Sequence, residues 1–122
     1  MNEKINLDSV SELQKRVQDF CEARDWDQFH SPKELAIGLS TEANELLQLF
    51  RFKTDEQMTE MMADPKKRDD VEQELADSFN FILRFAQMNN INLGQALMSK
   101  LAKNDAKYPV ETSRGSNRKY NE

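Results

Sequence analysis

The sequence has almost none of the residues that form disulfides, thiolate metal sites or multi-histidine sites. Cys21 is its only cysteine and His30 is its only histidine. An intrachain disulfide framework, a cysteine zinc site and a metal site with several histidines are therefore excluded. Glycine and proline occur three times each in 122 residues, which disfavours a β fold with many tight turns.

Long apolar runs and an excess of positive charge are missing as well. No segment approaches the roughly 18 apolar residues of a membrane span, and residues 1–10 lack the apolar core of a signal peptide. The net charge of -5 opposes binding to a phosphate backbone, which requires Lys and Arg. We therefore expect a cytoplasmic protein with neither a membrane nor a nucleic acid as its partner.

The composition fits one small domain that can self-associate. A chain of 122 residues has the size of a single domain. Hydrophobic residues make up 38% of it, and its mean hydropathy is -0.84. Because so hydrophilic a chain builds only a small core of its own, we expect a homo-oligomer.

Capping residues and apolar spacing predict an all-α fold with four long helices. Ser31 before Pro32 is the sharpest start, because serine caps a helix and proline suits its first turn. Residues 54–64 fit either a short helix or a loop. We expect residues 1–110 to form the domain and residues 111–122 to be a polar, basic tail, mobile or ordered over a ligand. The four helical segments are about 8–24, 32–52, 64–88 and 92–107.

The second and third predicted helices each carry two carboxylates on an apolar face. Glu42 falls inside the stripe of the second helix and Glu45 lies at its edge. Glu74 falls inside the stripe of the third helix and Asp77 lies beside it, with Asp70 one turn earlier. If the two helices pack antiparallel, the pairs converge. The stripes consist of Leu35, Leu39, Leu46 and Leu49, and of Val71, Ser78, Phe81, Ile82 and Phe85.

Converging carboxylates need positive charge, and a metal ion is the simplest source. Each buried carboxylate costs several kcal/mol unless it is compensated. The only cation near these faces is Arg84, which we expect at the edge of the third helix. Oxygen ligands alone favour Mg²⁺, with Mn²⁺ as the other candidate. A single acidic pair would more simply be a solvated helix surface, but two pairs inside apolar stripes favour a metal.

Basic and aromatic residues elsewhere fit a phosphorylated ligand with a base. Lys100 and Asn104 share one side of the fourth helix and could contact phosphates. The tail cations could close over phosphates or simply keep the tail soluble. Aromatic rings can stack on a base. Trp26, in a polar connector, is the strongest candidate; Phe29 and Phe81 could equally be core residues, and His30 could be structural or contact the ligand.

The two acidic motifs also form a recognisable pattern. The tetrapeptides EANE at residues 42–45 and ELAD at residues 74–77 resemble the ExxE…ExxD signature of the MazG-like all-α nucleoside triphosphate pyrophosphohydrolases. The connector and second helix (24–50), the segment 97–109 and the stretch SRGSNRKY at residues 113–120 are similar to the dCTP pyrophosphatase branch of that family. The resemblance covers nearly the whole chain.

This resemblance implies a function and a set of site residues. It implies a four-helix bundle that assembles as a tetramer, a dimer of dimers. It also implies Mg²⁺-dependent hydrolysis of a nucleoside triphosphate, with dCTP or a related substrate, between the α and β phosphates. The implied metal ligands are Glu42, Glu45, Glu74 and Asp77, and the implied substrate-binding residues are Trp26, His30, Phe52, Phe81, Lys100 and Asn104.

Three positions depart from the family pattern, and one rival function stays open. Thr41 stands where many MazG-like chains have glutamate, and Phe52 and Phe81 stand where this branch tends to have Trp and Tyr, which puts the preferred base in doubt. Glu45 is our choice for the residue that positions the attacking water, because it lies at the edge of its stripe. The rival is a non-catalytic helical oligomer that binds metal or nucleotide as a sensor.

Overall fold

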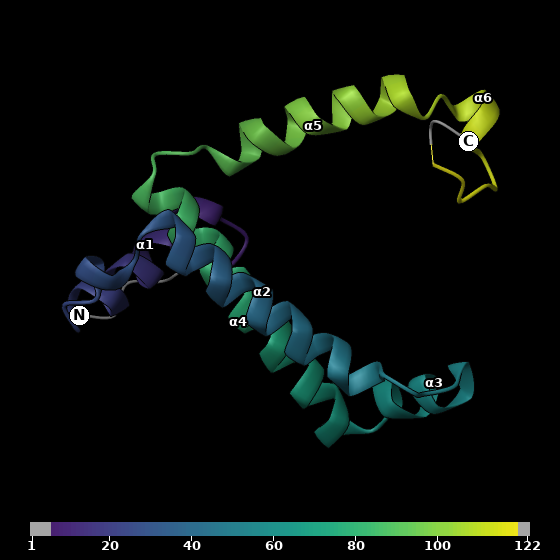
Figure 1. The fold of residues 1–122 in the computed structure, drawn as a ribbon, viewed down its shortest axis with the longest axis horizontal. Helices are drawn as coiled ribbons and strands as arrows, with labels where there is room; N and C mark the ends of the chain where they lie inside the picture. The colour runs from purple at the N-terminus through teal and green to yellow at the C-terminus, as the bar shows by residue number, and fades with distance from the viewer. Residues whose placement is uncertain (1–5, 120–122) are drawn as a thin grey trace. The chain divides into compact units, whose positions relative to one another are not determined.

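The fold is all-α, as the sequence predicts. The computed structural model describes residues 6–119, which contain six α-helices, one 3-10 helix and no strand (Figure 1). None of the helices in this range is long and apolar enough to cross a membrane. The elements are α1 (Val10–Glu22), η1 (Asp27–Phe29), α2 (Pro32–Phe50), α3 (Asp55–Ala63), α4 (Pro65–Met88), α5 (Leu93–Lys107) and α6 (Val110–Ser113).

Side-chain caps fix the helix starts where the sequence places them. The Ser9 hydroxyl accepts a hydrogen bond from the Glu12 amide at 3.3 Å, and Ser31 accepts one from Glu34 at 3.3 Å. Asn92 caps α5 in the same way. Each bond satisfies an amide that has no partner within its helix. The predicted starts of the four long helices are therefore confirmed.

The second helix ends two residues earlier than predicted. It stops at Phe50, and Arg51 leaves the helical region with a ψ of 134°. Phe52 then takes a left-handed backbone conformation with a φ of 64°. A left-handed residue just after a helix turns the chain away, and apolar spacing gives no sign of it.

Residues 54–64, which fit either a short helix or a loop, contain the helix α3. A complete capping box begins this helix. The Thr54 hydroxyl accepts from the Gln57 amide at 3.2 Å, and the Gln57 side chain accepts from the Thr54 amide at 2.9 Å. Asp64 ends α3 and caps α4. Met61 of α3 is buried.

The chain divides into two compact units, one up to Asn89 and one from Asn90 onward. In the first unit, α2 lies antiparallel to α4, and α1 and α3 also pack on α4 (Figure 1). The second unit holds α5 and α6; the short helix α6 lies in the predicted tail, where the sequence shows no helical period. The domain boundary at residue 110 stays a prediction, and tail residues 120–122 lie outside the described residues. The first unit's buried apolar residues are Cys21, Leu35, Met61, Val71, Leu83 and Ala86.

A glycine allows α2 and α4 to approach closely. Gly38 of α2 faces the ring of Phe81 of α4, and a Cβ atom at residue 38 would overlap that ring. Glycine weakens a helix interior, so its place here has a packing reason. Because the helices are antiparallel, this contact sets which residues face each other farther along the pair.

We expect Gly38→Ala to destabilise the protein, although alanine is the better helix former. Overlap with Phe81 should cost about 1–3 kcal/mol, more than the helix propensity gained, and should lower Tm by roughly 5 °C or more. Thermal unfolding followed by circular dichroism measures this. Gly94→Ala is the matched control, because its Cβ would meet only Asn92 at 3.4 Å. A Tm for Gly38→Ala equal to or above the parent's would contradict the packing argument.

Candidate metal centre and nucleotide site

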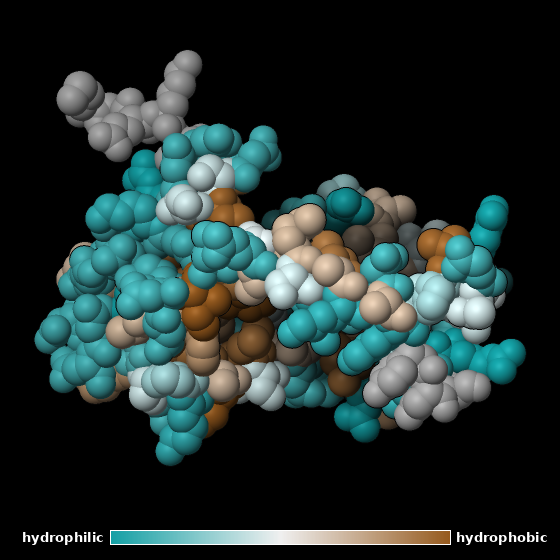
Figure 2. Space-filling view, turned by 90° about the horizontal axis from the view of Figure 1, so that it is seen from above, coloured by the Kyte–Doolittle hydropathy of each residue, from teal (hydrophilic) through white to brown (hydrophobic). Residues whose placement is uncertain are grey.

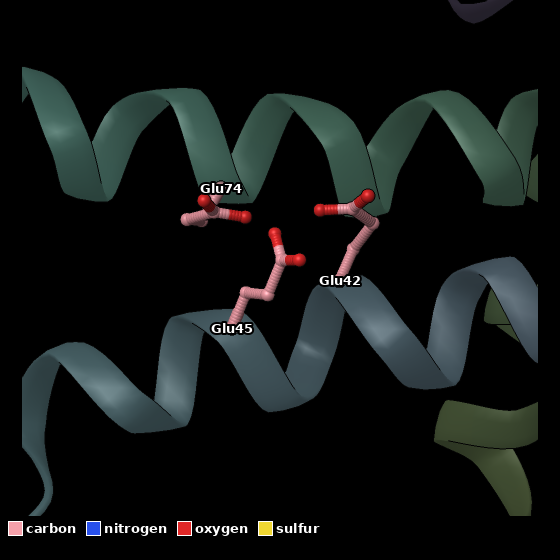
Figure 3. A group of neighbouring side chains, drawn as sticks. All are labelled: Glu42, Glu45 and Glu74. Atoms are coloured by element: carbon pink, nitrogen blue, oxygen red, sulfur yellow. The ribbon is translucent and has the colours of Figure 1, made fainter.

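Three carboxylates from two helices meet in the gap between α2 and α4. Glu42 and Glu45 reach up from α2 and Glu74 reaches down from α4 (Figure 3). One oxygen of each lies within 4.8 Å of the others. Glu42 and Glu74 are half-buried and Glu45 is exposed. The predicted convergence of the acidic pairs is confirmed for these three residues.

The other two acids predicted on or near the acidic face of the third helix lie apart from this group. Asp77 is exposed and is not within the 4.8 Å cluster, but its charge contributes to the raised pKa values of Glu42 and Glu74. Asp70 lines a separate cavity of about 480 Å³, together with Leu49 and Met61. Asp77 as a metal ligand therefore stays a prediction.

The carboxylate cluster lacks compensating charge. Oε2 of Glu42, Oε2 of Glu74 and Oγ of Ser78 are buried without a hydrogen-bond partner. None of the ion pairs between described residues involves the three glutamates. Burial, and then the neighbouring carboxyl groups of Glu45 and Glu74, raise the pKa of Glu42 to about 7. Burial also raises the pKa of Glu74.

These properties fit a hard divalent cation. The donors are all oxygens, two of them are buried without a partner, and the pKa values of Glu42 and Glu74 are raised by burial and by neighbouring carboxyl groups. An ion would supply the missing positive charge at the point where the three side chains converge. The acidic cluster thus has the ligand chemistry that the sequence predicts.

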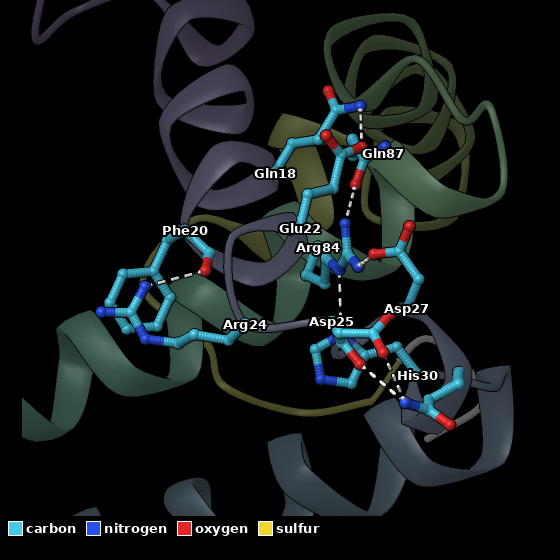
Figure 4. Close-up of polar contacts among 10 residues, drawn as sticks. Gln18, Phe20, Glu22, Arg24, Asp25, Asp27, His30, Arg84 and Gln87 are labelled. Carbon is cyan, nitrogen blue, oxygen red and sulfur yellow. Dashed lines mark hydrogen bonds and ion pairs between the residues drawn. The ribbon is translucent and has the colours of Figure 1, made fainter.

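The sequence predicts Arg84 at the edge of the third helix, and this prediction is wrong. Arg84 of α4 is buried, with 1% of its surface exposed. Its Nε donates to His30 Nδ1 at 2.9 Å and its Nη1 donates to Gln87 Oε1 at 2.7 Å (Figure 4). Its Nη2 forms an ion pair with Asp27. The connector after α1 covers this part of α4, so a side chain at the rim of an isolated helix becomes enclosed. The Nδ1 atom of His30 therefore has a structural role. The sequence had left a structural role and a ligand contact open for this residue.

The predicted aromatic residues divide into exposed and packed groups. Trp26 is 40% exposed and Phe29 is 61% exposed, so the connector presents two rings to solvent. The Trp26 ring meets His30 edge to face, with centroids 6.2 Å apart. Phe81 packs half-buried against Gly38. Phe52 is 88% exposed at the far end of α2, where Arg51 lies 4.6 Å from its ring centroid.

The residues predicted to bind phosphate belong to the second unit. Lys100 is exposed and Asn104 half-buried on α5, and their contact with a nucleotide stays a prediction. Within this unit, basic and hydroxyl side chains line a cavity of about 260 Å³. Its lining residues are Lys107, Tyr108, Thr112, Ser113, Ser116, Arg118 and Lys119.

Comparisons with known proteins place the chain in a family. A model of the MazG-like family matches residues 37–122. The chain is 35% identical over 112 residues to the dCTP pyrophosphatase 1 of Mus musculus, covering 92% of this chain and 66% of that protein, slightly less than two thirds of its length. It is 32% identical over 114 residues to the Homo sapiens protein of the same name, covering 93% and 67%. A crystal structure of a pyrophosphatase from Archaeoglobus fulgidus superposes with a TM-score of 0.77 at 29% identity, covering 88% of this chain and 99% of that one.

We expect the metal-free protein to become less stable as the pH rises, and Glu42→Gln to remove part of this dependence. The Glu42 carboxyl has a pKa of 4.5 when unfolded and about 7 when folded, so between these values the folded state binds more protons than the unfolded state. Stability from this group is therefore lost as the pH rises through that window. Tm measured from about pH 5 to about pH 8 in EDTA tests this, because the parent's Tm should fall more steeply than that of Glu42→Gln.

Added Mg²⁺ should stabilise the parent more than it stabilises Glu42→Gln. It should raise the parent's Tm, more at high pH where the carboxylates are ionised, and should raise that of Glu42→Gln much less. Glu56→Gln, at an exposed position outside the cluster, is the control and should follow the parent. Equal pH slopes for the parent and Glu42→Gln in EDTA would contradict the assignment of negative charge to this cluster.

Proposed function

The chain belongs to the MazG-like family, and from this and the site we infer that it is a metal-dependent nucleoside triphosphate pyrophosphohydrolase. Its substrate would be dCTP or a related deoxynucleoside triphosphate, cleaved between the α and β phosphates to give the monophosphate and pyrophosphate. The observation that carries this proposal is the cluster of Glu42, Glu45 and Glu74, with two buried carboxylate oxygens that have no partner. The names of the relatives support the choice of substrate.

The cluster offers distinct positions for binding an ion and for activating water. Glu42 and Glu74, whose Oε2 atoms are buried, would hold the metal, with Asp77 as a further ligand. Oxygen ligands favour Mg²⁺, and Mn²⁺ could replace it. When bound, the ion would neutralise charge on the phosphate oxygens.

Glu45 is the carboxylate best placed to act on water, because it is the exposed member of the cluster. It would orient a water molecule and accept its proton as the water oxygen bonds to the α-phosphorus. The bond from that phosphorus to the bridging oxygen then breaks, and pyrophosphate leaves. Glu42 would be a poorer base, since its carboxyl is turned into the helix interface.

We place the nucleoside along the same helix pair. Arg84, which holds the connector, is ten residues after Glu74 on α4, about 15 Å along the helix axis. Phe81 lies between them, facing Gly38. A nucleotide with its phosphates at the carboxylates could place its base near Phe81 and the connector ring of Trp26, whereas substrate contacts of Phe52, Lys100 and Asn104 stay predictions from the sequence.

Exposed apolar side chains support self-association. Leu75, Phe79 and Ile82 form one exposed stripe of α4 and are 52%, 40% and 37% exposed. Figure 2 shows apolar residues reaching the surface among hydrophilic ones. A homotetramer, with a four-helix bundle as its subunit, would cover such surfaces; exposed apolar stripes of this kind mark protein interfaces.

A panel of nucleoside triphosphates, assayed with Mg²⁺ and with EDTA, tests the proposal. We expect Mg²⁺-dependent release of pyrophosphate and the monophosphate from dCTP or another deoxynucleotide. Glu45→Gln should lower kcat by about 100-fold or more, because a positioned base contributes about that much. Glu56→Gln should have the activity of the parent.

Two outcomes would count against the enzyme. Release of inorganic phosphate and the nucleoside diphosphate would place the attack at another phosphorus. Nucleotide-dependent thermal stabilisation in Mg²⁺, with no product from any nucleotide of the panel, would favour the non-catalytic sensor.

A further inference from the structure

A buried arginine joins the connector to the helix that carries Glu74. The guanidinium of Arg84 uses three nitrogens on three different side chains: Nε on His30, Nη1 on Gln87 and Nη2 on Asp27 (Figure 4). Asp27 and His30 lie at the start and immediately after the end of η1. One side chain of α4 therefore holds both ends of this turn.

Stability alone does not account for a charge at this position. A guanidinium with 1% exposure has lost nearly all its hydration, and its ion-pair partner Asp27 is itself 52% exposed. An apolar side chain of similar volume is often as stabilising as a buried ion pair, or more so. An apolar residue could not supply the directed hydrogen bonds, and one of these reaches His30, a residue of the predicted substrate site.

That bond determines which nitrogen of His30 carries the proton. The Nε of arginine can donate a hydrogen bond but cannot accept one. Its contact with Nδ1 at 2.9 Å therefore requires Nδ1 to be unprotonated, so the proton of the neutral ring is on Nε2. Nε2 has no hydrogen-bond partner among residues 6–119.

The surroundings keep the ring neutral. Burial and then the positive charge of Arg84 lower the pKa of His30, while the carboxylate of Asp27 opposes them. These are the two charged groups that act on the ring from α4 and from the connector. The edge-to-face contact with Trp26, at 6.2 Å, holds the ring from a further side.

We propose that Arg84 is a positioning residue that locks His30 in the Nε2–H form, which makes His30 a fixed hydrogen-bond donor to an acceptor atom of the substrate's base or sugar. The substrate part of this proposal rests on the proposed function. An acceptor such as a ring nitrogen, a carbonyl oxygen or a sugar oxygen would be recognised, and a donor at the same place would be rejected because two hydrogens would meet. Arg84 itself need not touch the substrate.

The tautomer can be measured without any substrate. His30 is the only histidine, so the imidazole nitrogen signals of the ¹⁵N-labelled protein need no assignment. At neutral pH we expect Nδ1 to show the signal of an acceptor nitrogen and Nε2 that of a protonated one. Arg84→Lys and Arg84→Met should lose this preference. A proton on Nδ1 in the parent, or an unchanged spectrum in both folded variants, would overturn the proposal.

Kinetics separate positioning from a merely structural role. With dCTP as substrate, Arg84→Lys should raise KM by about 10-fold and change kcat by less than about threefold, since one directed hydrogen bond is lost. In a His30→Gln background, where an amide supplies the donor, Arg84→Met should change KM by less than about twofold. Equal effects of Arg84→Met in both backgrounds would show that Arg84 acts only on the fold.

Control variants keep the test decisive. Arg24→Gln changes the arginine of the connector itself, which lies over Phe20 at 3.7 Å and donates to the Phe20 carbonyl. It should leave the His30 signals and KM as in the parent. If Arg84→Met does not fold, Asp27→Asn weakens the clamp more gently, and the parent spectrum alone can still refute the tautomer. Absence of dCTP turnover would count against the proposed function, whereas the nitrogen signals decide the role of Arg84.

Discussion

The antiparallel contact between α2 and α4 is the constraint on which the first unit depends. Gly38 lets the Phe81 ring lie directly on the α2 backbone, and this sets the register of the two helices. In that register Glu42 and Glu45 meet Glu74 instead of pointing to solvent. A shift of one residue would rotate each carboxylate by about 100° out of the interface. Packing and chemistry are thus set by the same contact.

The chain buries charge in two different ways on the same helix. On one side of Phe81, carboxylates are brought together without a cation, and the pKa of Glu42 rises to about 7. On the other side, Arg84 is enclosed together with a carboxylate, an imidazole and an amide. The first arrangement is incomplete in the chain alone and suits a bound ion. The second is complete, and it holds the shape of the connector whether or not a ligand is bound.

The sequence predicted those features that depend on residues close together in the chain. Caps and apolar spacing located the helix starts, and the two acidic pairs in apolar stripes located the cluster, because both depend on residues a few positions apart. The role of Arg84 depends on partners 54 and 57 residues away, which no helical period connects. The early end of α2 depends on the backbone angles of Arg51 and Phe52.

Cys21 lies in the core of the first unit, 3% exposed, and burial raises the pKa of its thiol. A thiol must be both accessible and ionised to react, and in the folded chain this one is neither. Oxidants and alkylating agents therefore reach it only when α1 and α4 separate. The single cysteine of the sequence is thus shielded from thiol oxidants while the chain is folded, and its reactivity records how often this core opens.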